Sequence, residues 1–465
     1  MILSDVATYV TEKISSIDID KKYYVTTDSL LQNKEGRELA KNLPPTVCSL
    51  TKFIKGDILI SNIRPYLRKI WQADSTGACS LDVLVFRVKE NHDANFLYSI
   101  LLQDRFFDYV MKAPKGSKMP RGDQNHIMRF PIISFSEPDE KNIGSLIITI
   151  DNKIQINKQI NIKLEVLANK LYNYWFVQFN FPDKNGKPYK ASGGKMVYND
   201  LLKREIPKGW DVSPIGTLFD SSRGISYSSK TINNNGVPMV NLASFNIDGS
   251  YKPEGIKYYS GSYTNEKILK PFDLVMCNTQ QTAIDFSKDI IGRVFLVPNI
   301  FKGDIVYSHH VTNIKVKHDP IKFFLYRLFN TEHFHKYIAG FTNGTNILGL
   351  IFDGVENYQT ELPENLILDK YAMFALNIEK IKSIIIKENS ELIALRDSIL
   401  PLLMNGQIAV SDIEKSNDNV IPFNQNDNYN QKYNIWIQNQ GIAARGEKNI
   451  QTLKQIFDLM DDDDK

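Results

Sequence analysis

The sequence contains a long internal repeat. Aligned with itself at an offset of 228 residues, the chain matches positions 80–171 to positions 308–399 without a gap. Of these 92 aligned pairs, fifteen are identical, whereas average residue frequencies give roughly five or six by chance. The identities include the run FLY at 96–98 and 324–326 and the glycines of a tight turn at 116–117 and 344–345. A repeat of this length predicts two tandem copies of one structural unit.

Upstream of position 80 the repeat continues with gaps. The segment KGDILI at 55–60 resembles KPFDLV at 270–275, at a shorter offset. At a similar offset, Tyr24–Val25 is a candidate counterpart of Met239–Val240. The two copies therefore share a framework and differ in their loops. This is the pattern expected of two domains that do the same job on different targets.

A long helical pattern follows the globular part of each copy. Apolar residues recur at spacings of three and four between 147 and 175 and again between 374 and 402, as in heptads. About 37 residues make a helix of roughly 55 Å, whose single apolar stripe needs a partner helix. Asn157, Asn161 and Asn389 interrupt these stripes, where they either set the register between the helices or are partly exposed. We predict a mixed α/β (α+β) fold, with two similar globular domains joined by two long antiparallel coiled helices.

The predicted organisation has seven segments. In chain order they are a globular domain at 1–138, a spacer helix at 139–177, a connector rich in Gly, Pro and Lys at 178–209, a second globular domain at 210–364, a second spacer helix at 365–405, a polar linker at 406–431 and a helical tail at 432–465.

Composition limits the function and the compartment. With 56 Lys and Arg against 53 Asp and Glu, the net charge is only +3, so any contact with nucleic acid must come from local basic patches or from a partner. The three cysteines, Cys48, Cys79 and Cys277, lie far apart and in no C-x-x-C spacing, which favours a reducing compartment. We see neither a secretory signal nor a bilayer-length apolar stretch, and we expect a cytoplasmic protein with no membrane segment.

The motifs of catalysis are missing from the sequence. The closest string to the N/D-P-P-Y/F loop of amino-methyltransferases is NLPPT at 42–46, which lacks the contiguous tetrapeptide. We find no G-x-x-x-x-G-K-[ST] loop, and His309–His310 has none of the spacings of a metal site. Together with the duplication, this predicts a binding protein without catalytic residues or a metal of its own.

Two segments of the first copy are candidates for DNA contact. Around the Gly116 turn, four basic residues follow one another with no acidic residue between them, which favours phosphate contact over a merely solvated loop. These are Lys112, Lys115, Lys118 and Arg121. A second basic and aromatic segment follows a predicted strand, where an arginine can pair with guanine, the alternative being an ordinary exposed strand end. It contains Arg64, Tyr66, Arg68 and Lys69.

The second copy has amides where the first has charges. The segment that corresponds to 62–69 is NTQQT at 278–282, and side-chain amides pair naturally with adenine edges. Its candidate DNA contacts are Thr279, Gln280 and Gln281, with Arg223, Tyr227, Asn343, Thr345 and Asn346 as further candidates that are each otherwise ordinary surface residues. By contrast, Phe106, Tyr109, Phe334 and Tyr337 recur in both copies, and we predict that they belong to the cores.

The region after the first helical pattern resembles a known family. YWFVQFNF at 174–181, NGKPYK at 185–190 and GGKM at 193–196 look like the segment after the first spacer helix in type I restriction-modification specificity subunits. IPKGW at 206–210 looks like the entry to their second target recognition domain, and QGIAARG at 440–446 is similar to their tail. The chain departs from the family just before each helix, where SEP at 136–138 and LPE at 362–364 replace the frequent Pro-Pro and Glu-Gln pairs.

The resemblance implies a non-catalytic DNA-recognition subunit. Each globular domain would read one half of a split site in double-stranded DNA, and the helices would set the gap, about one DNA turn or ~34–36 Å. The assembly would contain two methyltransferase subunits and restriction (translocase) subunits. The cofactors would belong to these partners: S-adenosylmethionine to the methyltransferase, and ATP and magnesium to the restriction subunits. Two alternatives are a coiled-coil scaffold for proteins and the DNA-binding part of a single-chain restriction-methylation enzyme.

Overall fold

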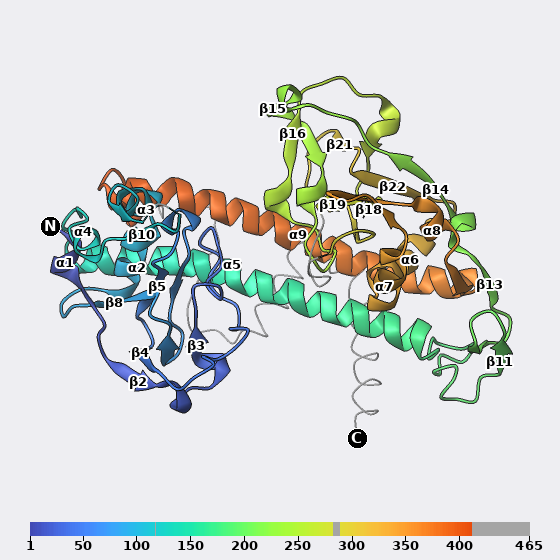
Figure 1. The fold of residues 1–465 in the computed structure, drawn as a ribbon, viewed down its shortest axis with the longest axis horizontal. Helices are drawn as coiled ribbons and strands as arrows, with labels where there is room; N and C mark the ends of the chain where they lie inside the picture. Colours follow the sequence, from blue (N-terminus) through green and yellow to red (C-terminus); the bar gives the residue numbers. More distant parts are fainter. Residues whose placement is uncertain (117, 282–288, 412–465) are drawn as a thin grey trace. The chain divides into compact units, whose positions relative to one another are not determined.

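The computed structural model describes residues 1–116, 118–281 and 289–411, which form two compact units (Figure 1). Unit 1 comprises Met1–Gln159 and the segment that begins at Glu388, and unit 2 comprises Ile160–Lys387. Several parts of the chain lie outside the described residues: Ser117, most of the predicted polar linker, and the predicted helical tail at 432–465 with the motif at 440–446.

Unit 1 contains two four-stranded sheets. The first has the order β1 (Ala7–Tyr9), β8 (Val83–Val88), β5 (Ile58–Ser61) and β6 (Ile70–Gln72), and the second has the order β2 (Lys13–Ser15), β4 (Ser49–Phe53), β7 (Gly77–Cys79) and β3 (Tyr24–Val25). The helices that accompany them are α1 (Leu3–Val6), α2 (Ala94–Leu102), α3 (Asp104–Val110) and α4 (Gln124–Ile127).

Unit 2 has two sheets of the same size. The first has the order β14 (Phe219–Arg223), β22 (Val311–Val316), β18 (Leu274–Cys277) and β20 (Val294–Leu296), and the second has the order β16 (Lys257–Tyr259), β15 (Ile232–Val240), β21 (Ile305–Tyr307) and β17 (Ile268–Leu269). Its shorter helices are α6 (Ile321–Asn330), α7 (Glu332–Ala339) and α8 (Phe352–Glu356).

The strand registers reproduce the repeat seen in the sequence. In unit 1 Phe86 of β8 pairs with Ile58, and in unit 2 the residue 228 positions later, Ile314, pairs with Leu274. The proposed match of Tyr24 with Met239 is confirmed, because each begins a parallel pairing, with Ala78 and with Val306 respectively. The copies differ in the fourth strand of this sheet, because β2 flanks β4 in unit 1, whereas in unit 2 β16 lies at the opposite edge, beside β15, the counterpart of β3.

The repeated aromatic residues form the cores, as predicted. Phe106 and Phe334 are fully buried in the main clusters of units 1 and 2. Tyr109 and Tyr337 are half-buried and pack against the same clusters. The FLY runs are buried on α2 and α6. Since burying one aromatic side chain removes a large apolar area from water, these positions are retained in both copies while the loops differ.

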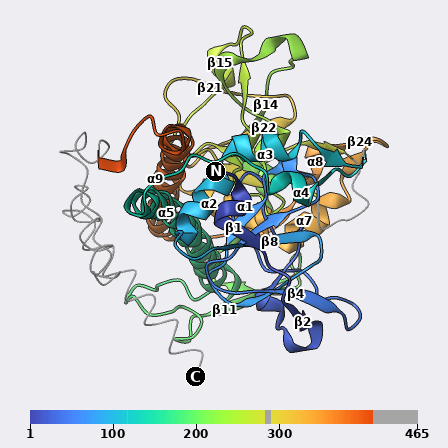
Figure 2. The ribbon, with the colours of Figure 1, turned by 90° about the vertical axis from the view of Figure 1, so that its left-hand side faces the viewer.

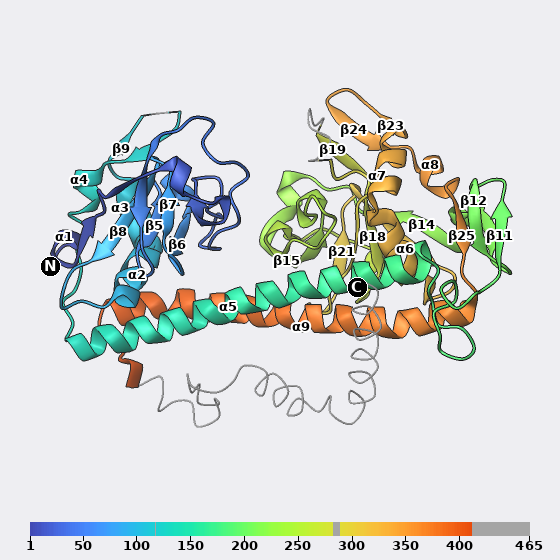
Figure 3. The same cartoon turned by 90° about the horizontal axis from the view of Figure 1, so that it is seen from below.

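The two long helices of the prediction are present as α5 (Glu137–Tyr172) and α9 (Asn365–Met404). A π-helical turn at Asn173–Val177 continues α5. Figures 2 and 3 show the two helices side by side. Their lengths agree with the predicted length of about 37 residues. Among the described residues, no helix is both long and apolar enough to span a membrane.

Polar contacts between α5 and α9 show that the helices run antiparallel within each unit. In unit 1, Asp151 pairs with Arg396 at 2.7 Å, whereas six residues later Asn157 donates to Asn389 Oδ1 at 2.9 Å. In unit 2, Glu165 pairs with Lys382 at 2.7 Å, and ten residues later the Trp175 ring lies 5.8 Å from the Tyr371 ring. Asn157 is 1% exposed, so its hydrogen bond to Asn389 favours the register-setting alternative over partial exposure.

Each unit also joins the long helices to its globular part through a buried ionic cluster. In unit 1, Tyr98 of α2 donates to the Asp151 carboxylate at 2.5 Å, and Arg396 neutralises that carboxylate. In unit 2, the residue equivalent to Asp151 is Glu379, which pairs with Arg327 of α6 at 3.1 Å. Arg327 is only 5% exposed. A buried charge of this kind is tolerated only when it is paired.

Glu165 completes the unit 2 cluster by accepting from both Arg327 and Lys382. Burial alone would raise the pKa of Glu165, but the charges and hydrogen bonds of Lys382 and Arg327 outweigh burial and lower the pKa to about 2. The pKa of Glu165 is thus lower in the folded than in the unfolded chain. The stabilising contribution of its carboxylate is therefore present above about pH 4.5 and is lost as the pH falls toward 2.

The connector motif folds onto unit 2 as an aromatic cluster. The ring of Phe181 stacks between Trp210 at 5.1 Å and Tyr189 at 4.8 Å. A hairpin of β11 (Met196–Asn199) and β12 (Arg204–Pro207) precedes β13 (Asp211–Pro214), which pairs with β25 (Gln359–Leu362). The IPKGW motif is therefore the point at which the chain enters the globular part of unit 2.

Replacing Asp151 tests the buried cluster of unit 1. Asp151→Asn keeps the shape of the side chain but leaves Arg396 with one less buried counter-charge, and we expect the free energy of unfolding to fall by ~3 kcal/mol. Lys141→Ala serves as the control, because Lys141 forms an exposed pair with Glu137 on the same helix, and the loss of such a pair has little effect on stability. Urea unfolding measures both values, and equal losses would contradict the account.

Candidate nucleic-acid interface

In unit 1, three loops meet beside the ends of the strands. The backbone of Arg64, which follows β5, donates to Pro120 O at 2.8 Å in the hairpin of β9 (Pro114–Lys115) and β10 (Arg121–Gly122). Asn62 N donates to Asp82 O at 2.8 Å in the turn at 80–82. The structure thus brings together the two segments, 64–69 and 112–121, that the sequence marked separately as DNA contacts.

Unit 2 repeats this arrangement with the same hydrogen bonds. Gln280, in β19 (Thr279–Gln281), pairs with Leu348 in β24 (Ile347–Leu350), which matches the Arg64–Pro120 contact of unit 1. Asn278 N donates to His310 O at 2.9 Å, as Asn62 does to Asp82. Figure 3 shows β19, β24 and β23 (Thr342–Asn343) as neighbours. We call this set of three loops the platform: residues 62–69, 80–82 and 114–122 in unit 1, and 278–281, 308–310 and 342–350 in unit 2.

Glycine is required where the unit 1 platform is most tightly packed. A Cβ on Gly122 would lie 2.8 Å from side-chain atoms of Ile127 and Val110, and 3.0 Å from Asn62 Oδ1. That oxygen is buried and has no hydrogen-bond partner among the described residues, as is Oδ1 of Asn278, its equivalent in unit 2. The two platforms therefore share this buried asparagine, whereas Leu350 stands in unit 2 at the position of Gly122.

The residues of unit 1 predicted to contact DNA differ in their exposure and in their bonds to the rest of the unit. Arg64, Tyr66, Lys112 and Lys118 have exposed side chains. Lys69 instead donates to Thr27 O at 2.6 Å, and burial lowers the pKa of its amine, so it stabilises the loop from within. Arg68 is half-buried and pairs with Asp104 at 3.0 Å.

Acidic residues from other segments neutralise part of the basic hairpin. Lys115 pairs with Asp123 at 2.5 Å, and Arg121 pairs with Asp82 at 3.0 Å. The sequence shows no acid between the four basic residues, but the fold supplies two acids from outside that stretch. The platform of unit 1 is thus less positive than the sequence alone indicates.

In unit 2 the amide-rich segment is partly internal. Gln280 is 5% exposed, and its Oε1 accepts from Ile290 N at 2.7 Å, which favours a structural role over contact with a base. Thr279 Oγ1 lies 2.6 Å from His310 Nδ1. For Gln281 the structure describes only the backbone, which lies in β19. Asn343, Thr345 and Asn346 are exposed on the hairpin of β23 and β24.

Arg223 and Tyr227 lie in a cluster with three residues that the sequence analysis did not select. Arg223 ends β14 and is exposed. The Tyr227 ring lies 5.5 Å from Lys257 Nζ and 5.9 Å from the His309 ring. His309 and His310 were tested only as metal ligands, and the described residues contain no cluster able to hold a metal. The offset of 228 would have identified them, because it matches His310 to Asp82 in the platform turn.

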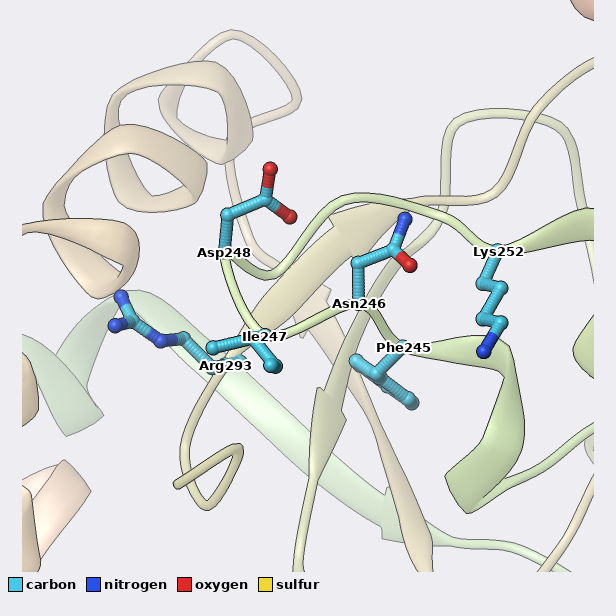
Figure 4. Close-up of a pocket in the computed structure, with 6 residues that line it drawn as sticks. All are labelled: Phe245, Asn246, Ile247, Asp248, Lys252 and Arg293. Atoms are coloured by element: carbon cyan, nitrogen blue, oxygen red, sulfur yellow. The ribbon is translucent and has the colours of Figure 1, made fainter. Parts of the chain in front are cut away.

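A surface pocket in unit 2 lies outside the platform as defined. It is lined by Phe245, Asn246, Ile247, Asp248, Lys252 and Arg293. Figure 4 shows that the charged groups of Lys252 and Arg293 lie on opposite sides of the loop and do not converge. Arg293 Nη1 donates to Asn330 O at 3.0 Å, so this arginine stabilises the fold. The pocket is therefore a weaker candidate than the platform for binding an anion.

Comparisons with known proteins point to one family. No protein-family model matches the chain. The "Type I restriction enzyme MjaIX specificity subunit" of Methanocaldococcus jannaschii is 24% identical over 375 residues, which cover 79% of this chain and 81% of that protein. The HindI specificity subunit of Haemophilus influenzae is 25% identical over 186 residues, 38% of this chain and 40% of that protein.

A solved structure supports the fold. The type I restriction-modification S subunit from M. genitalium superposes with a TM-score of 0.54 at 11% identity, covering 87% of this chain and 95% of that one. The chain thus has the mixed α/β fold of an S subunit, and its curated homologues are type I restriction enzyme specificity subunits. These names agree with our prediction of a recognition subunit rather than an enzyme.

Removing the acid that neutralises Arg121 tests whether the unit 1 platform contacts DNA. Asp82→Asn frees one positive charge there, and we expect the affinity for a mixed-sequence duplex at low salt to rise roughly threefold. Asp319→Asn is the matched control, since it breaks the Asp319–Lys322 pair and changes the net charge equally. Fluorescence anisotropy measures both, and an equal effect of the two substitutions would argue against the platform.

Proposed function

We propose that the chain is the DNA-specificity subunit of a type I restriction-modification complex and that each unit reads one half of a bipartite site in double-stranded DNA. The observation that carries this proposal is the repeated platform. Its backbone hydrogen bonds are conserved between the two units, whereas its side chains differ in chemistry at equivalent positions. Two domains that recognise different DNA sequences require a shared backbone framework that carries different side chains.

The differences fall on residues suited to reading bases or phosphates. In the repeat, Lys115 corresponds to Asn343, and Lys118 to Asn346. Positive side chains pair with phosphates and guanine, whereas amides pair with adenine edges. Unit 1 therefore reads its half-site with Arg64, Tyr66, Lys112, Lys118 and the paired Arg121. Unit 2 uses Thr279, Gln281, Asn343, Thr345 and Asn346 together with Arg223 and Tyr227.

The long helices act as spacer and docking surface in this proposal. Antiparallel α5 and α9 join the two target recognition domains as a coiled pair and set the gap between the half-sites. Several apolar side chains on these helices are strongly exposed, which supports their contact with protein partners. They include Ile162, Val166, Leu366, Met373 and Leu395.

The partners supply the chemistry. Two methyltransferase subunits bind S-adenosylmethionine, and restriction subunits bind ATP and magnesium, all in the cytoplasm. This chain then contributes recognition and requires no cofactor of its own. Salt dependence distinguishes this function from that of a scaffold that binds only protein. True phosphate contacts make the affinity for DNA fall steeply as the salt concentration rises.

Exchange of one domain tests the bipartite proposal. Residues 210–364 are replaced by the corresponding domain of another specificity subunit, and the chimaera is expressed with its methyltransferase. Methylome sequencing of the host is expected to show a change in one half of the methylated site, with the other half and its methylation retained. A change in both halves, or in neither, would overturn the modular assignment. The unaltered chain with the same methyltransferase is the control.

A further inference from the structure

Five side chains of unit 2 form a basic cluster beside its platform. They are Tyr227, Lys257, His309 and His310, which contact one another, and Arg223, whose charge acts on His310. The two imidazole rings lie 3.9 Å apart between centroids, and Lys257 Nζ is 3.5 Å from Tyr227 OH. Two strands and a turn therefore contribute to one group: β14 at its end, β16 through Lys257, and the turn between β21 and β22.

Acidic partners are missing from this cluster. Among the residues that the structure describes, neither Arg223 nor Lys257 forms an ion pair, in contrast to Lys115 and Arg121 of unit 1. The carboxylate at the equivalent turn position of unit 1, Asp82, is replaced here by His310. Close positive groups without counter-charges repel one another, and an incoming anion relieves that repulsion.

The histidines are held in place by their neighbours. His310 Nδ1 lies within 2.6 Å of Thr279 Oγ1, which fixes the orientation of its ring. His309 Nδ1 is buried and has no hydrogen-bond partner among the described residues. Burial, followed by the charges of His309, Lys257 and Arg223, lowers the pKa of His310. The free protein therefore carries a neutral His310 near neutral pH.

We propose that this cluster binds a backbone phosphate of DNA and takes up a proton when it does so, so that unit 2 holds DNA more tightly as the pH falls. The inference rests on the proposed function, because it requires that unit 2 contacts DNA. A phosphate placed against the cluster favours the protonated imidazole, which raises the histidine pKa in the complex above that in the free protein. Affinity then increases as the pH falls through the interval between these two values.

The test measures affinity against pH at constant ionic strength. The full-length chain is titrated with a fluorescein-labelled, mixed-sequence duplex, because a phosphate contact does not require the cognate sequence. We expect the wild-type chain to bind roughly tenfold more tightly at pH 6 than at pH 8, as uptake of one proton over about one pH unit of that interval predicts. The double variant His309→Gln, His310→Gln should change less than twofold over the same interval.

Two controls keep the result interpretable. His333→Gln removes an exposed histidine from α7 of the same unit and should retain the full pH dependence. Lys257→Met removes a cation that does not titrate in this range, and should weaken binding at both pH values and reduce the salt dependence by about one phosphate contact. Circular dichroism confirms that each variant is folded.

The outcomes separate this inference from the proposed function. Salt-sensitive DNA binding that does not depend on pH, or whose pH dependence survives in the double variant, overturns the inference and leaves the proposed function standing. Failure of the wild-type chain to bind duplex at either pH counts against both. Inorganic phosphate is added as a competitor at matched ionic strength, and displacement of DNA at low millimolar phosphate would instead identify a site for the free anion and overturn the DNA assignment.

Discussion

The structure depends on buried charges that must be paired. In unit 1, Arg396 of α9 is bound to Asp151 of α5, and Tyr98 of α2 donates to the same carboxylate. In unit 2, Arg327 of α6 is held between Glu165 and Glu379. An apolar stripe alone permits two helices to slide by one turn, whereas a misplaced buried ion leaves several kcal/mol uncompensated. These clusters therefore define where each globular part meets the long helices, and the same position of the repeat, 151 and 379, provides the acid in both units.

Duplication explains how one framework presents two different surfaces. The residues that recur, such as Phe106 and Phe334, are buried in the main core cluster of each unit. The residues that differ lie on the loops themselves, where a change of side chain costs little stability. Even the fourth strand of the second sheet differs, β2 beside β4 in unit 1 and β16 beside β15 in unit 2, without disturbing the three strands that the two sheets share. Recognition can thus diverge while the core is kept.

The sequence predicted the features that depend on local pattern or on the repeat. The long helices follow from apolar spacing, and the match of Tyr24 with Met239 follows from the alignment, which the strand registers confirm. The sequence did not predict how the charges would be balanced, because Asp82 and Asp123 reach Arg121 and Lys115 only after the loops have folded together. The burial of Gln280 likewise depends on Ile290, which the fold places next to it. The histidine pair was overlooked because its spacing was judged against metal sites alone.

The two platforms handle positive charge in opposite ways. Unit 1 holds Arg121 and Lys115 in ion pairs, so in the proposed interface a DNA phosphate competes with Asp82 or Asp123 for them. In unit 2, Arg223 and Lys257 form no ion pair among the described residues, and burial together with the charges of His309, Lys257 and Arg223 lowers the pKa of His310. In our proposal, part of the positive charge of each unit becomes available only when an anion binds, by exchange of partners in unit 1 and by uptake of a proton in unit 2. A nearly neutral chain can therefore bind DNA locally without the large basic excess that would hold it on any polyanion.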